Sequence, residues 1–252
     1  MRPPGRWVSL TVIAAAGLAL ALLLDLPWPV RLAIVALVVV LAAGPFLLDR
    51  SARRTLRRHH DEIEEWAAAT GMTYQPTLDR PEWVRWLPWR PHATLGPAVS
   101  GSYEGRQLTV AEYSRSRTLP HGGVVREAMV VCVVPLSRSH PDLVVDLPVL
   151  ARWWPGRHVA RFRTGEVAFD RRFRVRAEDP DHAAALLGPE LRAGMLTHEL
   201  PLWEVHEREL IVAWPLSLRP AEMPERLAAT LRLVELIEAA EDVAGGDIHI
   251  EE

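Results

Sequence analysis

Two uninterrupted apolar runs dominate the start of the chain and predict two membrane-spanning helices. Residues 7–24 carry no charge, and residues 29–48 carry only Arg31, close to one end. At about 1.5 Å per residue, the first run reaches roughly 27 Å, which is near the thickness of the bilayer hydrocarbon. A short turn separates the runs, so residues 1–48 are expected to form a transmembrane helical hairpin. A cleavable signal peptide is the alternative for the first run, but the immediate second run favours the hairpin.

The flanks of the two runs predict the orientation of the hairpin. The turn between the runs holds one acid and no base, whereas five arginines follow the second run: Arg50, Arg53, Arg54, Arg57 and Arg58. The positive-inside rule therefore places both termini in the cytoplasm, at a bacterial inner membrane. Residues 49–71 are expected to form a basic juxtamembrane helix at the lipid surface, with Gly71 as its C-cap.

From residue 72 to residue 242 the pattern changes to short alternating runs broken by glycine and proline. Early strands with later helices predict a cytoplasmic α+β domain with a mainly antiparallel sheet. Glu104-Gly105 is expected to turn one hairpin. "REAMVVCVVPL" and "DLVVDL" are read as separate strands, and further hairpins are expected across Gly165 and between "LWEVHE" and "ELIVAWP".

The later helices have clearer end signals than the strands. Asp179 is expected to cap a helix that starts at Pro180, and Gly188-Pro189 is expected to divide it from a second helix. The last helix is predicted from about residue 220 to 242, with its buried stripe at Met223, Leu227, Leu231, Val234 and Ile237. Residues 243–252 lose that periodicity and are expected to form a flexible acidic tail.

This order of elements resembles a group of uncharacterised two-span membrane proteins from GC-rich bacteria. The resemblance rests on the apolar hairpin, "WAAATGMTY", "GSYEGRQLTVAEYS", "EVAFDRRFRVRAEDPDHAAALLGPELRAGML" and "LWEVHERELIVAWP". It covers most of residues 60–240 and implies a cytoplasmic domain of unknown function. The group has no established activity to carry over, so the resemblance concerns the architecture alone.

Composition narrows the class of protein only a little. All 29 basic residues are arginine, which is typical of GC-rich codon usage, and the formal charge of −3 argues against a nucleic-acid-binding protein. Cys132 is the only cysteine, which fits a reducing compartment, and its apolar neighbours predict a core strand. No sequence motif indicates a metal or other cofactor, so none is expected.

Two stretches are candidate interaction surfaces. Arg172, Arg174 and Arg176 alternate with apolar residues, which predicts a cationic strand face paired with acids of the same chain, for which the acid-rich C-terminal region is the expected source. A specific phosphate site is the alternative, although nearby acids oppose it. The second stretch combines Trp83, Arg85, Trp86 and Trp89. Its tryptophans suit either the membrane headgroup layer or the domain core, and the sequence leaves both open.

No nucleophile, metal or phosphate motif is evident, and the histidines are read as surface residues. The domain is therefore expected to be non-catalytic and to act by binding, as a membrane-anchored adaptor for a protein partner or as a small-ligand sensor. A membrane-bound hydrolase with dispersed residues is the alternative, with His121, Glu112 and Asp170 as candidates. The sequence does not indicate an oligomeric state.

Overall fold

The computed structural model describes residues 27–88, 93–119, 123–148, 160–215 and 217–246. The chain divides into two compact units, Met1–Asp61 and Glu62–Glu252. The predicted span at 7–24, residues 247–252 of the predicted tail and the segment 149–159 lie outside the described residues. The prediction of a tail is wrong for residues 243–246, because they continue the last helix.

The described part of the first unit is helical. Helix α2 runs from Trp28 to Ala69, so the predicted second span and the predicted juxtamembrane helix form one continuous helix. Within the residues that the structure describes, no helix combines the length and hydropathy required of a membrane span. Arg54, Arg57 and Arg58 are exposed on this helix.

Helix α2 ends within the second unit, where Gly71 stops it as predicted. Gly71 has a φ of +71°. The N–H of Gly71 donates to the carbonyl of Ala68, and the N–H of Met72 donates to the carbonyl of Ala67 at 2.9 Å. These two bonds satisfy the last carbonyls of the helix in the Schellman arrangement, which requires a left-handed residue at this position.

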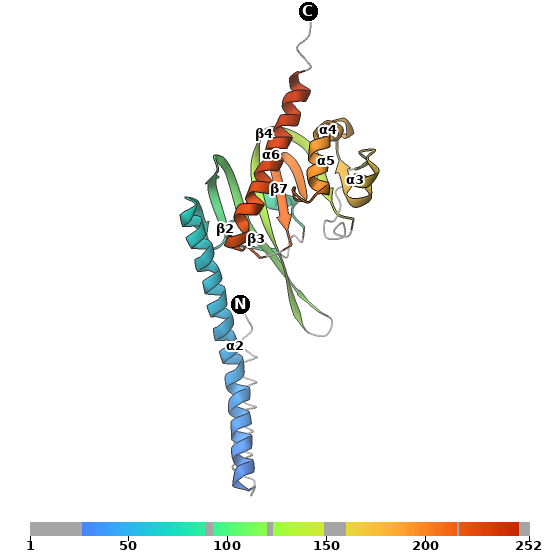
Figure 1. The fold of residues 1–252 in the computed structure, drawn as a ribbon. Helices are drawn as coiled ribbons and strands as arrows, with labels where there is room; N and C mark the ends of the chain where they lie inside the picture. The colour runs from blue at the N-terminus through green and yellow to red at the C-terminus, as the bar shows by residue number, and fades with distance from the viewer. Residues whose placement is uncertain (1–26, 89–92, 120–122, 149–159, 216, 247–252) are drawn as a thin grey trace, which may run out of the picture. The chain divides into compact units, whose positions relative to one another are not determined.

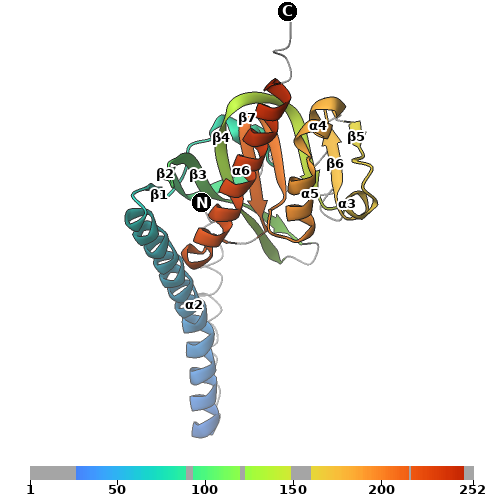
Figure 2. The same ribbon diagram turned by 45° about the horizontal axis from the view of Figure 1, so that its top comes forward.

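The second unit is an α+β domain on an antiparallel sheet, as the sequence predicts (Figures 1 and 2). The central strand β4 (Val124–Asp146) pairs along one edge with β3 (Arg106–Thr118) and, further along, with β6 (Arg174–Ala177). Its other edge pairs with β7 (Trp203–Trp214). The sheet continues from β3 to β2 (Ala93–Tyr103) and β1 (Thr73–Gln75), and from β6 to β5 (Ala160–Phe162).

Helices cover one face of this sheet and enclose the larger core. They are α3 (Val167–Arg172), α4 (Pro180–Leu186), α5 (Pro189–Leu196) and α6 (Met223–Gly246). Figure 2 shows α6 crossing the sheet, with α5 beside it. The predicted stripe of α6 is confirmed, because all five residues are buried in this core: Met223, Leu227, Leu231, Val234 and Ile237.

A short segment covers part of the opposite face. The 3-10 helix η1 (Glu82–Trp86) and the residue after it bury Trp83, Val84 and Leu87 against alternate strand residues such as Tyr113. The hydroxyl of Tyr113 donates to the carbonyl of Pro88 and holds the segment there. Trp83 therefore lies in the core of the domain, while Trp89 lies outside the described residues.

Two predicted strand boundaries are wrong for the same physical reason. "REAMVVCVVPL" and "DLVVDL" belong to the single strand β4, and "LWEVHE" and "ELIVAWP" belong to the single strand β7. The register shifts between Pro135 and Leu143, opposite Glu207, whose φ is +54°. Such a bulge moves the next residues to the other face, so the alternation restarts without a turn.

A third prediction, the hairpin across Gly165, is also wrong. "EVAF" lies in helix α3, and β5 pairs with β6 instead. The carboxylate of Asp170 accepts from the N–H and hydroxyl of Thr164, both at 3.0 Å, and from the N–H of Gly165 at 3.1 Å. These bonds form a compact turn that leads into the helix and places Phe169 in the core. Four alternating residues are too few to separate strand from helix.

Two further local predictions, the hairpin turn at Glu104-Gly105 and the cap of α4, are confirmed. Tyr103 pairs with Arg106, so Glu104-Gly105 forms a two-residue hairpin turn with φ values of +49° and +80°. Positive φ at both positions is the requirement of a type I′ turn. The Asp179 carboxylate accepts from the N–H groups of residues 181 and 182, which caps α4 above Pro180.

Candidate functional site

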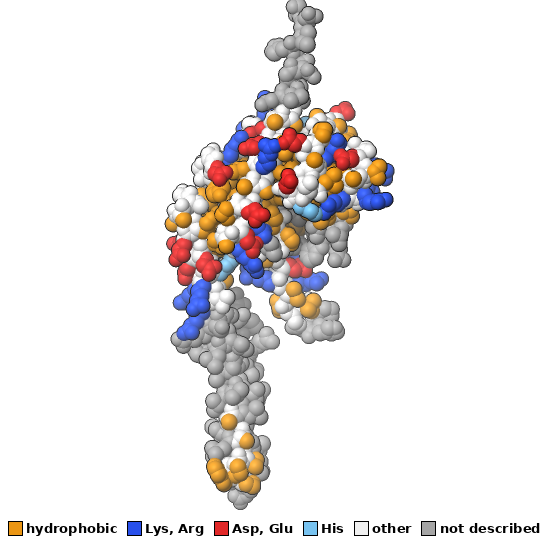
Figure 3. Space-filling model, in the orientation of Figure 1, with side chains coloured by type: hydrophobic (Ala, Val, Ile, Leu, Met, Phe, Trp, Pro, Cys, Tyr) orange, Lys and Arg blue, Asp and Glu red, His pale blue; other side chains and the backbone are white. Residues whose placement is uncertain are grey.

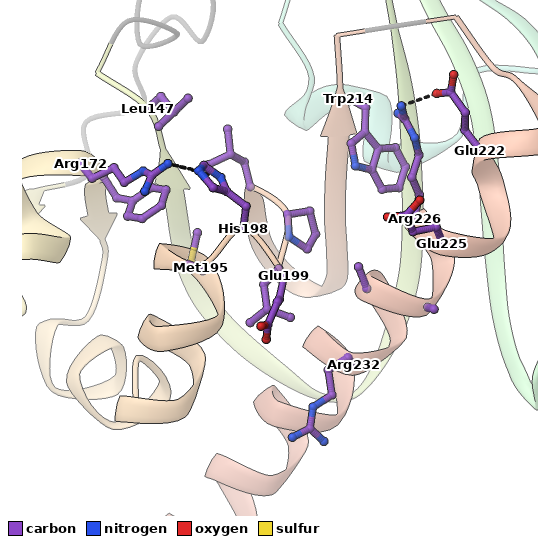
Figure 4. Close-up of a pocket in the computed structure, with 16 residues that line it drawn as sticks. Leu147, Arg172, Met195, His198, Glu199, Trp214, Glu222, Glu225, Arg226 and Arg232 are labelled. Carbon is purple, nitrogen blue, oxygen red and sulfur yellow. Dashed lines mark hydrogen bonds and ion pairs between the residues drawn. The ribbon is translucent and has the colours of Figure 1, made fainter.

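A groove of about 950 Å³ lies over the helical layer of the domain. The C-terminus of α5 and the loop after it form one wall, and α6 forms the other (Figure 4). Its apolar lining comes from six different elements and loops: Leu147, Phe173, Met195, Leu200, Leu202, Trp214, Ala228 and Ala229. A volume of this size is typical of a site for one small ligand.

Arg172 and His198 meet at one end of the groove. Figure 4 shows the guanidinium of Arg172 directed at the imidazole of His198. The same guanidinium donates to the carbonyl of Leu196 at 3.0 Å and lies 5.8 Å from the ring centre of Phe173. Among the described residues, Arg172 makes no ion pair with a carboxylate, so within that part of the chain its charge has no anionic partner.

The other two arginines of the groove are already paired. Arg226 forms an ion pair with Glu222 at 2.5 Å and lies 5.6 Å above the ring of Trp214. Arg232 contacts the carboxylates of Glu190 and Glu235. The groove is therefore not uniformly cationic, and its uncompensated positive charge is concentrated at the Arg172 end. Figure 3 likewise shows basic and acidic side chains interspersed over the domain.

His198 has an unusual backbone for its residue type. It occupies the position after the C-cap of α5 with a φ of +66°, where glycine is the common residue. Its N–H donates to Met195 at 3.2 Å, and the N–H of Glu199 donates to Gly194 at 2.9 Å, which completes a second Schellman arrangement. A histidine here costs about 1 kcal/mol relative to glycine. The structure thus retains an imidazole at the mouth of the groove despite that cost.

A second polar centre is buried on the opposite face of the sheet. The ring of His206 is hydrogen-bonded to Asp142 at 2.8 Å through Nδ1 and to Glu204 at 3.0 Å through Nε2. Burial by itself lowers the pKa of His206, but the hydrogen bonds and charges of Glu204 and Asp142 outweigh it and raise the pKa. Trp86 stacks on the imidazole at 4.5 Å, and Arg85 pairs with Glu207 at 2.8 Å. The centre therefore ties η1 to the bend of β4 and β7.

A neutral histidine pair lies near the same bend. Nδ1 of His140 is 3.1 Å from Nε2 of His182 at the start of α4. Burial, followed by the neighbouring His182 and Arg138, lowers the pKa of His140 to about 4. Burial also lowers the pKa of His182. A lowered pKa makes each ring a weak base near neutral pH. The pair therefore serves as a structural contact between β4 and α4.

Arg174 and Arg176 meet an acid of the same chain, as the sequence predicts. Arg174 bonds to Asp146 at 2.7 Å and 3.1 Å, and Arg176 bonds to it at 3.2 Å. The acid is in the neighbouring strand β4, so the expectation that the C-terminal region would supply it is wrong. Arg172 differs from both because it ends α3 and faces the groove on the other side of the sheet.

The residues considered for a hydrolase have structural roles where they are described. The Glu112 carboxylate accepts from the N–H of Leu218 at 2.9 Å and is buried under β2. Asp170 holds the turn before α3. His121 lies outside the described residues, and so do the side chains of Arg50 and Arg53. Among the described residues, no group of three or more His, Cys, Asp and Glu side chains is placed to hold a metal ion.

Comparison with known proteins adds one observation. No family model and no curated protein matches the chain. The crystal structure of the mycobacterial trehalose monomycolate transport factor A, TtfA, is similar in fold, with a TM-score of 0.53 and 15% sequence identity. The match covers 72% of this chain and 95% of that one. At this identity, the likeness shows a shared fold only.

The sequence did not reveal the groove. The sequence pattern predicts Arg172 as one of three equivalent strand arginines and the histidines as surface residues. His198 is exposed, whereas His140 and His206 are buried, so the surface prediction is wrong for those two. The available signal was the position of His198 directly after a helix, where a glycine is expected. The pairing of residues 172 and 198 depends on how α3 packs beside α5, which no local pattern encodes.

Proposed function

We propose that this protein is a membrane-anchored, non-catalytic binding module whose ligand site is the groove between α5 and α6. The observation that carries the proposal is the groove itself, with its apolar lining and one uncompensated arginine. The apolar runs at 7–24 and 29–48 support an anchor, and the arginines after them support a cytoplasmic domain at a bacterial inner membrane.

The arrangement of titratable groups favours binding over catalysis. An acid–base or nucleophilic site needs such groups converging on one cavity. The candidate groups Glu112, Asp170 and His206 do not line the groove: the first two serve separate backbone contacts, and His206 is enclosed by two carboxylates and a tryptophan. Within the groove, His198 contacts Arg172 and Glu222 is paired with Arg226. The similar fold belongs to a protein named for trehalose monomycolate transport, which is compatible with a domain that carries or presents a ligand.

A pull-down from native membranes tests the ligand site. The tagged full chain is isolated in gentle detergent, and bound small molecules and proteins are identified by mass spectrometry. Ala229→Trp places an indole in the groove and is expected to remove the bound molecule, while Ala239→Trp on an exposed part of α6 is the matched control. Retention of the same molecule by both variants would refute the groove as its site. A stoichiometric protein that Ala229→Trp does not release would favour an adaptor with another surface.

Cysteine labelling tests the proposed membrane topology. Cys132 is buried, and burial raises the pKa of its thiol to about 12, so the native thiol is unreactive. A cysteine introduced by Asp25→Cys is then the single target for a membrane-impermeant maleimide in intact cells. The proposal expects labelling there, and expects Glu252→Cys to react only after the membrane is opened. The reverse pattern would overturn the orientation.

A further inference from the structure

We infer that the groove takes a single-chain anionic amphiphile, such as a long-chain carboxylate, with its headgroup at Arg172 and its chain along the apolar lining toward Trp214. This inference rests on the proposed function, because it names the ligand class of the same groove. Two features of the groove indicate this ligand: the position of its charged side chains and the apolar lining between Arg172 and Trp214 (Figure 4).

The charge of the groove selects a monoanion. Arg226 and Arg232 are neutralised by glutamates, so only Arg172 offers an uncompensated guanidinium. In the groove, the guanidinium of Arg172 donates to a ring nitrogen of His198, and a nitrogen that accepts this bond carries no charge. A carboxylate is a stronger acceptor and matches the planar fork of the guanidinium. An entering anionic headgroup can therefore replace His198 as the partner of Arg172.

The same lining disfavours more highly charged ligands. Three carboxylates border the groove: Glu199, Glu222 and Glu225. Glu222 is paired with Arg226, but Glu199 and Glu225 would repel the additional negative charges of a nucleotide or another polyanion, for which the lining offers Arg172 as the cationic partner. The chemistry of the site thus favours one negative charge at one end of the ligand.

The apolar part of the groove suits a hydrocarbon chain. Figure 4 shows Met195 beside Arg172 at one end, and Trp214 beside Arg226 at the other. Met195 and Phe173 are buried in the core, so the apolar area that a ligand can cover comes from more exposed lining residues such as Leu202, Trp214 and Ala228. Covering this lining with methylene groups gives a favourable free energy in proportion to the area removed from water.

Photo-crosslinking tests the inference on the full chain in lipid nanodiscs. The probes are a diazirine-bearing long-chain fatty acid and its methyl ester, and labelled peptides are mapped by mass spectrometry. The fatty acid is expected to label peptides from residues 195–202 and from α6, with the ester at least several-fold weaker. Arg172→Gln is expected to reduce labelling roughly tenfold, the loss of one charge-assisted hydrogen bond. Arg172→Lys keeps the charge and retains most labelling. Arg171→Gln, at an exposed arginine of α3 that does not line the groove, is the matched control.

Each outcome separates the inference from the proposed function. If the acid and the ester label the groove equally, or if Arg172→Gln does not change the labelling, the inference that an anionic headgroup binds Arg172 is wrong. The groove would still be supported as a binding site. Arg172-dependent labelling by a diazirine phosphatidic acid at the same level would overturn the single-chain carboxylate. Absence of groove labelling by every probe, with a bound molecule still lost in Ala229→Trp, would also overturn the inference while supporting the groove as a site.

Discussion

The buried centre around His206 makes a sharp prediction about stability. His206→Ala removes two hydrogen bonds to carboxylates, at 2.8 Å and 3.0 Å, and the stack with Trp86. Each hydrogen bond to a charged group contributes about 1.5–3 kcal/mol, and breaking a buried ion pair costs about 3–5 kcal/mol. We therefore expect the free energy of unfolding to fall by about 3–5 kcal/mol, a large share of the stability of an ordinary domain.

The pH dependence of the same group has a definite sign. The pKa of His206 is raised in the folded protein, so its charged form is stabilised there. The contribution is complete below the unfolded pKa of about 6.5 and is lost as pH rises through the folded pKa. Wild-type protein should thus lose stability as pH rises above about 6.5 toward the raised folded pKa, and His206→Ala should lack this loss. The carboxylates that interact with the ring, Asp142, Glu204 and Glu209, are present in both proteins. The comparison therefore isolates the contribution of His206.

Urea unfolding of the full chain, followed by far-UV circular dichroism, measures both effects. His206→Gln keeps a neutral donor and should be intermediate, which preserves the test if the alanine variant does not fold. His198→Gly is the control, because it removes another histidine while placing glycine at a positive φ. It should raise the free energy of unfolding by about 1 kcal/mol, because glycine adopts a positive φ without strain. An identical pH slope in wild type and His206→Ala would refute the reasoning.

Three further predictions follow from other buried contacts. Asp146→Asn weakens the bonds to Arg174 that join β4 to β6, and should lower the free energy of unfolding by about 1–3 kcal/mol in urea titrations. Because the pKa of His140 is lowered to about 4, wild type should lose stability as pH falls from about 6.5 toward 4; His140→Phe should flatten that acid limb in thermal melts. Leu227→Ala, at a fully buried position of α6, should cost about 2–5 kcal/mol, and a change under 1 kcal/mol would contradict the core assignment.

The features that sequence predicts well here are those with local causes. Asp179 before Pro180, Gly71 after a helix and Glu104-Gly105 between two strands each satisfy a backbone requirement within a few residues. The stripe of α6 is equally local, since helical spacing alone aligns its apolar side chains on one face. These signals suffice for the α+β class and for most helix ends.

The strands of the sheet show where local pattern fails. β4 and β7 each change faces at a bulge near Pro135 and Glu207, and a single sequence cannot distinguish that change of phase from a turn. Only the long-range pairing of the two strands keeps each one continuous, because their backbone groups must find partners across the sheet.

The candidate sites depend still more on tertiary structure. The sequence by itself determined that Arg174 and Arg176 face away from the core, because strand alternation dictates the face. The acid that pairs with them, Asp146, was decided by the pairing of β4 with β6. Only the tertiary structure decided that Arg172 lies in the groove, on the other side of the sheet from Arg174 and Arg176, and that it contacts His198. Arg172 ends α3 and His198 follows α5, so their contact depends on how these two helices pack on the core. The reason is physical: side chains distant in sequence converge by packing, and packing is set by the whole domain rather than by any one segment.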